Sequence, residues 1–128
     1  MVDVSVSAQL SAFSKSPFEI IFFEEYKKLD NLCKDLLGSN QGITQYVNEM
    51  EQIPFEKSKL VESWQYDYKM LKHIRWIRNN IAHNNGDSEC SESDVQYVKN
   101  FYQRIINRTD SFSLINVEIR KAEDNQAS

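Results

Sequence analysis

The chain has 128 residues, of which 41 % are hydrophobic and 27 % charged, and this length fits one compact domain with a single core instead of two domains. Its formal net charge of −4 argues against a protein that coats nucleic acid through many distributed cations, although it leaves room for a local anion site. Only three Gly and two Pro are present, and the longest periodic runs have helical spacing, so the sequence predicts an all-α fold.

The cysteines and the apolar runs indicate in which cellular compartment the protein is expected. Cys33 and Cys90 stand far apart, without CxxC spacing and without His at metal-ligand intervals. This favours a reducing cytosol over a disulfide scaffold and argues against a zinc site. No apolar run is long enough for a membrane helix, and the N-terminus lacks the pattern of a secretion signal. We therefore expect a cytoplasmic protein without membrane contact, metal or cofactor.

Three segments are expected along the chain. Residues 1–15 are mostly small and polar, which predicts a flexible N-terminal arm. Residues 16–109 carry the helical periodicity and are predicted to form the folded domain. Residues 110–128 begin with a short apolar patch and end in the polar run KAEDNQAS, which predicts a disordered tail. The patch either packs on the domain or contacts a partner, and it comprises Leu114, Ile115, Val117 and Ile119.

The first helix is predicted between Ser16 and Leu37. Ser16 can cap it, Pro17 suits the first helical position because its missing N–H costs nothing there, and Glu19 completes a capping box. Gly38 directly follows, which is typical of a helix end. The expected buried stripe consists of Phe18, Phe22, Tyr26 or Glu25, Leu29, Cys33 and Leu36.

Further helices are predicted over 43–53, 66–84 and 93–107. Residues 55–65 also have helical spacing, and they form either a separate short helix or the first turns of the central one. Ser91 and Ser93, with Glu92 and Asp94 beside them, supply capping groups and first-turn acids for the last helix. Short connections then favour an antiparallel bundle of four or five helices. The expected buried residues are Ile43, Tyr46, Val47 and Met50 in the second helix, and Val95, Val98, Tyr102 or Phe101, and Ile105 in the last.

The central helix concentrates positive charge in an acidic chain. Residues 69–85 read KMLKHIRWIRNNIAHNN, with both histidines of the protein, four of its fifteen Lys and Arg residues, and no carboxylate. Apolar residues recur at spacings of three and four, which predicts one buried stripe. That stripe comprises Met70, Ile74, Ile77 and Ile81, and the opposite side carries Lys72, Arg75, Asn79 and His83.

The segment Arg78-Asn79-Asn80-Ile81-Ala82-His83 resembles the motif of the HEPN superfamily, in which an Arg and a polar residue precede a His at the end of a core helix. The resemblance is sharpest over roughly residues 66–107. It implies a HEPN-like helical bundle that acts as a metal-independent endoribonuclease and a homodimer, leaving a cyclic phosphate on the RNA. It also implies a toxin–antitoxin or phage-defence context, with an antitoxin or regulatory protein as a possible partner.

The chemistry of these side chains suits RNA cleavage. A guanidinium binds phosphate oxygens as a fork, and an imidazole transfers protons near neutral pH. We therefore expect Arg78 to bind the scissile phosphate, His83 to act as general base or acid, and Asn79 to orient the imidazole. On one helix Arg78 and His83 are about 140° apart, so they flank a groove over Ala82, and a two-fold partner would bring a second pair opposite.

Other polar residues of the central helix are candidates for RNA binding or for an interface. The RNA-binding candidates, which would follow the nucleic-acid backbone, are Lys72, Arg75, Asn80 and Asn84. For Lys72 and Arg75 the alternative is an ordinary solvated helix face. His73 is predicted to be a half-buried interface residue. Trp76 falls on the His83 side, where a neighbouring helix or a dimer partner should cover it, with base stacking as the minor alternative.

Simpler interpretations remain open for the same residues. His83 in the last helical turn can cap carbonyls, because the helix dipole favours a cation there. Arg78 can form a surface ion pair with Asp87 or Glu89. The alternative function is then a catalytically silent HEPN-like module for dimerisation or partner binding, which the acidic net charge and the apolar patch near the C-terminus favour.

Overall fold

The computed structural model describes residues 17–83 and 90–127, and over these residues the chain is helical without any strand. The predicted all-α class and the helical bundle are therefore confirmed. The helices are α2 (Pro17–Leu37), α3 (Ile43–Gln52), α4 (Phe55–Ser58), α5 (Trp64–Ala82), α6 (Glu92–Ile106) and α7 (Ser111–Ala127).

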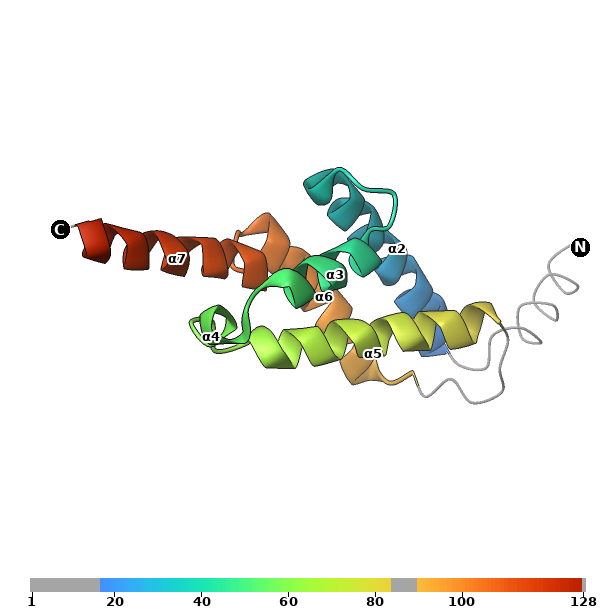
Figure 1. Cartoon of the computed structure of the whole chain (residues 1–128). Coiled ribbons are helices and arrows are strands. Elements are labelled where there is room, and N and C mark those ends of the chain that lie inside the picture. Colours follow the sequence, from blue (N-terminus) through green and yellow to red (C-terminus); the bar gives the residue numbers. More distant parts are fainter. Residues whose placement is uncertain (1–16, 84–89, 128) are drawn as a thin grey trace, which may run out of the picture.

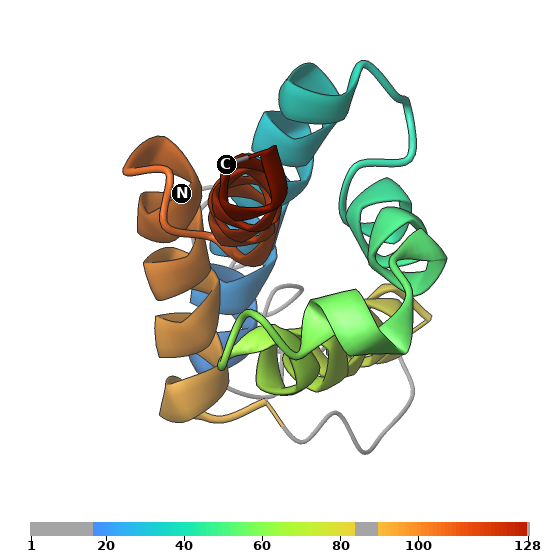
Figure 2. The same cartoon turned by 60° about the vertical axis from the view of Figure 1, so that its left-hand side comes forward.

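The bundle is built from α2, α3, α5 and α6, and α7 extends away from it (Figure 1). The most extensive contact joins α2 to α6, while α3 packs against both α2 and α5. Figure 2 shows α3 and α6 on opposite sides of the molecule. In that view α2 and α6 run in the same direction, and the Cys90 thiol before α6 lies 3.8 Å from the carbonyl oxygen of Phe18 near the start of α2. The prediction of a wholly antiparallel bundle is therefore wrong for this pair.

The structure decides the boundaries that the sequence left open. The short helix α4 is separate, and α5 begins at Trp64 after a turn, so residues 55–65 are not one helix. The capping box before α6 is formed, since Ser91 and Asp94 each accept a hydrogen bond from the other's backbone N–H. Pro17 begins α2, as expected, whereas the predicted cap Ser16 lies outside the described residues.

The prediction of a disordered tail over the final run KAEDNQAS is wrong, because helix α7 (Ser111–Ala127) continues through this run to Ala127. Phe112 and Ile115 pack against the core at its start, whereas the side chains of residues 120–126 are exposed. Once the first turns are anchored, each added residue costs little, and a Glu118–Lys121 ion pair at 3.4 Å supports the next turn. A polar sequence without a core contribution therefore continues as a helix that projects from the bundle (Figure 1).

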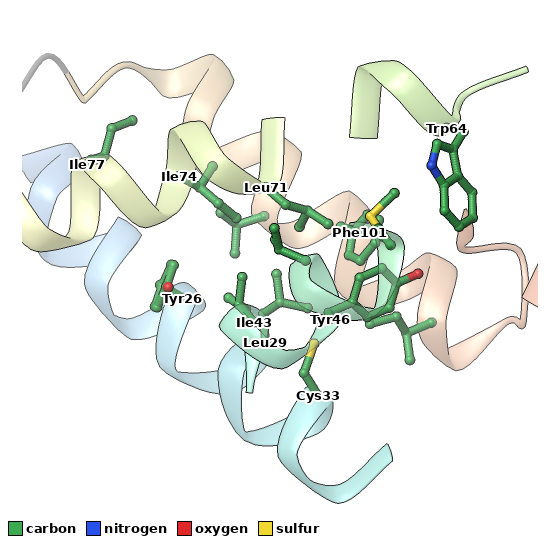
Figure 3. Close-up of a cluster of buried hydrophobic side chains, with 14 of the residues drawn as sticks. Tyr26, Leu29, Cys33, Ile43, Tyr46, Trp64, Leu71, Ile74, Ile77 and Phe101 are labelled. Carbon is green, nitrogen blue, oxygen red and sulfur yellow. The ribbon is translucent and has the colours of Figure 1, made fainter. Parts of the chain in front are cut away.

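The core lies where α2, α3, α5 and α6 meet (Figure 3). All four expected residues of the second helix are buried, as are Val95, Val98 and Ile105 of the last, with Phe101 instead of Tyr102 at the alternative position. In α2 the middle of the predicted stripe is buried, but its ends Phe18 and Leu36 are exposed. Burial raises the pKa of the Cys33 thiol to about 12, so this cysteine is a protonated core residue.

A buried carboxylate joins three helices. Asp67 of α5 is fully buried and accepts two hydrogen bonds from Arg104 of α6, at 2.9 and 2.7 Å. It also accepts from the hydroxyls of Tyr97 at 2.8 Å and Ser111 at 2.6 Å. Burial alone would raise the pKa of Asp67, but the hydrogen bonds from Arg104, Ser111 and Tyr97 outweigh it and lower the pKa. The carboxylate therefore stays charged and ties α5, α6 and α7 together.

A second buried contact fixes the start of α7. The Tyr46 hydroxyl donates to the Asp110 carboxylate at 2.5 Å and accepts from the backbone N–H of Phe112 at 3.1 Å. Ser113 donates to the other carboxylate oxygen of Asp110. These bonds connect α3 to the first turn of α7, which explains why the chain after residue 110 is ordered at its base.

Replacing Asp67 by Asn should strongly destabilise the fold, because Arg104 then loses its partner beside the core. We expect a loss of about 3–5 kcal/mol in the free energy of unfolding, measured by urea denaturation at pH 7. Asp35→Asn, on the exposed side of α2, is the matched control and should change stability by less than about 0.5 kcal/mol. An equal effect of both substitutions would contradict the role of Asp67.

The Asp67 carboxylate also predicts that the free energy of unfolding decreases at acidic pH. Because the pKa of Asp67 is lowered from its usual 3.8, its contribution is fully present above that pH and is lost as the pH falls through the folded-state value. Wild-type stability should therefore fall as the pH drops below about 4, and Asp67→Asn should lack that part of the loss. Urea unfolding across this range compares the two proteins, and parallel pH curves would count against the pairing.

Two glycines in the α2–α3 connection provide a matched test of backbone packing. Both have positive φ, +59° at Gly38 and +56° at Gly42, so alanine is strained at each by about 1 kcal/mol. A Cβ at Gly42 would also lie 2.2 Å from the Asp30 carboxylate oxygen, which accepts from the N–H of Ile43 at the start of α3. Gly42→Ala should therefore cost about 1–3 kcal/mol more than Gly38→Ala in thermal or urea unfolding.

Candidate functional site

Helix α5 holds the candidate residues on a rigid base. Leu71, Ile74 and Ile77 are fully buried along one side of it (Figure 3). Ile74 and Ile77 confirm the predicted stripe, but Leu71 takes the place expected for Met70, which is half-buried. The helix begins at Trp64, two residues before the predicted start at residue 66. Side chains on the remaining faces are therefore presented from a helix that cannot shift without disturbing the core.

Arg78 is exposed and lies toward α2. Its guanidinium is 5.9 Å from the ring centroid of Phe23, a cation–π contact. Its Nη1 atom also donates to the side-chain oxygen of Asn79 at 3.4 Å, a long hydrogen bond. The alternative ion pair with Asp87 or Glu89 involves residues outside the described ranges. Arg78 is thus held loosely at the surface, with its fork open to an anion.

His83 is the C-cap residue of α5 and is exposed. Its backbone N–H donates to the carbonyl of Asn79 at 3.0 Å, but its imidazole has no hydrogen-bond partner among the described residues. The expected bond from the Asn79 side chain to the imidazole is not formed, because that amide contacts Arg78. The carbonyl-capping alternative for the imidazole is likewise absent from the described contacts. Arg78 and His83 leave the helix on different sides, about 140° apart.

The predicted RNA-binding residues do not form one cluster. The Lys72 ammonium lies over the Tyr68 ring, 4.0 Å from its centroid. It belongs to the side of α5 that also carries Trp76 and His83, here called the outer side. Arg75 points toward α3 instead, where Nη1 is 3.4 Å from the hydroxyl of Thr44. Asn80 is half-buried, and Asn84 lies outside the part of the chain that the structure describes. Lys72 is the member of this set that shares the outer side with His83.

His73 forms a hydrogen bond with Asp94 of α6 that the sequence reasoning missed. Its Nε2 atom lies 3.1 Å from a carboxylate oxygen of Asp94, whose other oxygen accepts from the N–H of Ser91 in the capping box of α6. The capping pattern in the sequence points to Asp94 as a first-turn acid. Its contact with His73 depends on the packing of α5 against α6, which that pattern does not contain. His73 also lies nearly parallel to Trp76, with ring centroids 6.2 Å apart and 17° between the planes. Trp76 is 50 % exposed, so the expected covering helix is absent within the described chain.

Three further features of the described ranges concern possible metal ligands, the cysteine thiols and the hydropathy of the helices. No three His, Cys, Asp or Glu side chains gather there as metal ligands. Both cysteines are free, and burial raises the pKa of the Cys90 thiol to about 12, which keeps it protonated. No helix in the described part of the chain is long and apolar enough to cross a membrane.

Comparison with known proteins gives a family without an assigned activity. Residues 20–128 match the model of a family described as "Family of unknown function (DUF6548)". The chain belongs to this family. Neither a curated protein nor a solved structure matches it. Any argument about function in this family therefore starts from the side chains described above.

The exposed positions of Arg78 and His83 predict that both can be replaced without unfolding the protein. Arg78→Ala and His83→Ala should each change the free energy of unfolding by less than about 0.5 kcal/mol. Ile77→Ala, one residue away but fully buried, should lose about 2–5 kcal/mol. Urea denaturation measures all three, and a large loss in either exposed variant would show a structural role.

Proposed function

We propose that this protein is a metal-independent endoribonuclease of HEPN type. The observation that carries the proposal is that a core helix, buried along Leu71, Ile74 and Ile77, presents an exposed guanidinium and an exposed imidazole at its end. Neither group forms an ion pair with a described residue. Both sit within the Arg-Asn-x-x-x-His segment that resembles the HEPN motif.

The proposed reaction uses the nucleophile that RNA itself carries. The 2′-hydroxyl oxygen attacks the adjacent phosphorus while the imidazole of His83 accepts its proton. The bond from phosphorus to the 5′-oxygen breaks, and that oxygen takes up a proton as it leaves. The products end in a 2′,3′-cyclic phosphate and a 5′-hydroxyl. Arg78 binds the non-bridging oxygens and stabilises the charge that grows on them.

Asn79 has a positioning role in this scheme. Its side-chain oxygen accepts from Arg78, and its carbonyl accepts from the backbone N–H of His83. It therefore contacts both functional residues, although not through the imidazole. In this role Asn79 orients the guanidinium of Arg78 and does not select the tautomer of the His83 imidazole.

A homodimer would complete the site, since one protomer directs Arg78 and His83 to different sides of α5. Ile20 is 43 % exposed and lies three residues from Phe23, on which the Arg78 guanidinium rests. A second protomer packed against this apolar surface would bring its own Arg and His pair to the first. The second imidazole can then protonate the leaving oxygen. This arrangement resembles the two-fold cleft that the motif implies.

The biological setting is part of the proposal. The resemblance implies a cytoplasmic toxin or phage-defence effector whose activity an antitoxin or regulatory protein restrains. A surface groove between α7 and the segment before α5 would suit such a partner. Its lining includes Leu60, Tyr66 and Leu114, and the first two are exposed.

The same groove favours the second candidate function, a catalytically silent module that binds a partner protein. Val117 of α7 is also exposed, and an exposed apolar side chain on a projecting helix is typical of an interaction surface. In that case the Arg78 and His83 pair would have no chemical role. The cleavage assay below separates the two functions.

Cleavage of a mixed RNA in the presence of EDTA tests the proposal. We expect the wild type to produce cyclic-phosphate ends and His83→Ala or Arg78→Ala to lose at least about 100-fold in rate. Arg120→Ala, which removes an exposed cation from α7, is the matched control and should cleave normally. Sedimentation should show the same oligomeric state for every variant.

Two results would contradict the enzyme assignment. Cleavage that survives both substitutions would come from a contaminant or from another site. A well-folded dimer that binds no RNA and cleaves none would favour the partner-binding module.

A further inference from the structure

An exposed tryptophan is held in a fixed orientation on the outer side of α5. Trp76 is half exposed and lies nearly parallel to His73, which is itself paired with Asp94 at 3.1 Å. Asp94 is in turn fixed by the capping box with Ser91. The indole is therefore supported by a chain of contacts that reaches into α6. Its open face is pre-organised, so binding there would cost little ordering entropy.

The charges around Trp76 favour an anion. Lys69 and Lys72 are exposed on the same side of α5, within about 40° of Trp76 by helical geometry. Residues 68–83 contain no Asp or Glu, and two carboxylates from other helices contact this stretch. Asp94 is shared between His73 and Ser91, and Glu51 accepts a hydrogen bond from the Tyr68 hydroxyl at 2.6 Å. A second copy of the chain on this surface would bring two sets of cations together, which like-charge repulsion disfavours.

Trp76 also lines up with the proposed catalytic imidazole. Seven residues separate Trp76 from His83, which places them about 20° apart around the helix and about 10 Å apart along it. Arg78, by contrast, is about 160° from Trp76. A strand that lies along this side of α5 with one base on the indole would therefore pass over His83.

We propose that Trp76 is a stacking platform for a base of single-stranded RNA, with Lys69 and Lys72 beside it for the phosphates. Aromatic faces bind bases without regard to sequence, and flanking cations hold the backbone, which is the usual chemistry of single-strand recognition. The identity of the ligand rests on the proposed function. The substrate is then unpaired at this site, because a base inside a duplex has both faces covered and cannot stack on the indole.

The chain offers a direct optical test, because its other tryptophan is buried. Trp64 is 3 % exposed and packs on Phe112, with ring centroids 5.5 Å apart, so a bound base reaches only Trp76. The probe is a single-stranded 2′-O-methyl RNA of mixed sequence, which lacks the nucleophile and stays intact. Tryptophan emission and the anisotropy of a labelled oligonucleotide are followed in one titration of the full chain.

We expect the oligonucleotide to quench the emission as it binds. Trp76→Ala should weaken binding about tenfold, whereas Trp76→Phe should retain most of the affinity because it keeps an aromatic face. Ile106→Ala, a matched loss of exposed apolar surface on α6, should leave binding unchanged. A double-stranded RNA of the same sequence should quench much less.

Several results would overturn the inference. Binding without quenching, and with equal affinity in Trp76→Ala, would remove the stacking role, and so would the absence of any binding. Emission that changes with protein concentration alone, together with weaker self-association of Trp76→Ala in sedimentation, would assign the surface to a second copy. Failure of the proposed function is a separate result: quenching by the oligonucleotide without cleavage of natural RNA refutes the enzyme and leaves the platform.

Discussion

The buried carboxylate of Asp67 is the constraint on which the arrangement of the helices depends. A charge inside the core is tolerated only if every oxygen is paired, and here Arg104, Tyr97 and Ser111 supply the donors from α6 and the start of α7. Hydrophobic packing alone would allow α5 to slide or rotate against α6 at modest cost. A two-pronged ion pair with two further hydroxyls has one geometry, so it sets the register of the helices.

That register determines what the other end of α5 exposes. With its first half tied through Asp67 and its middle packed through Ile74 and Ile77, the last turns present side chains in fixed directions. Arg78 faces the α2 side, whereas Trp76 and His83 face outward. The helix therefore separates a guanidinium from an imidazole instead of joining them. A site that uses both needs a second protomer or a ligand that wraps around the helix end.

Much of the fold could be predicted from local sequence signals, and the predictions that failed did so for physical reasons. The start at Pro17, the capping residues at the start of α6 and the whole buried face of α3 were predictable, because caps and periodicity depend on neighbours in sequence. α7 was missed because its distal half buries nothing, so no periodic pattern marks it, and its order comes from the Tyr46–Asp110 contact. The parallel course of α2 and α6 was missed because helical spacing contains no information on direction.

The sequence by itself determined the helical class, the central helix as the bearer of the cations, and the exposed Arg78 and His83 near its end. These follow from composition and from a spacing that one helix translates directly into faces. Only the tertiary structure decided that His73 pairs with Asp94, that Asn79 contacts Arg78, and that Trp76 stays half exposed. These two contacts and the exposure of Trp76 depend on how whole helices pack against one another. No local sequence pattern encodes that packing.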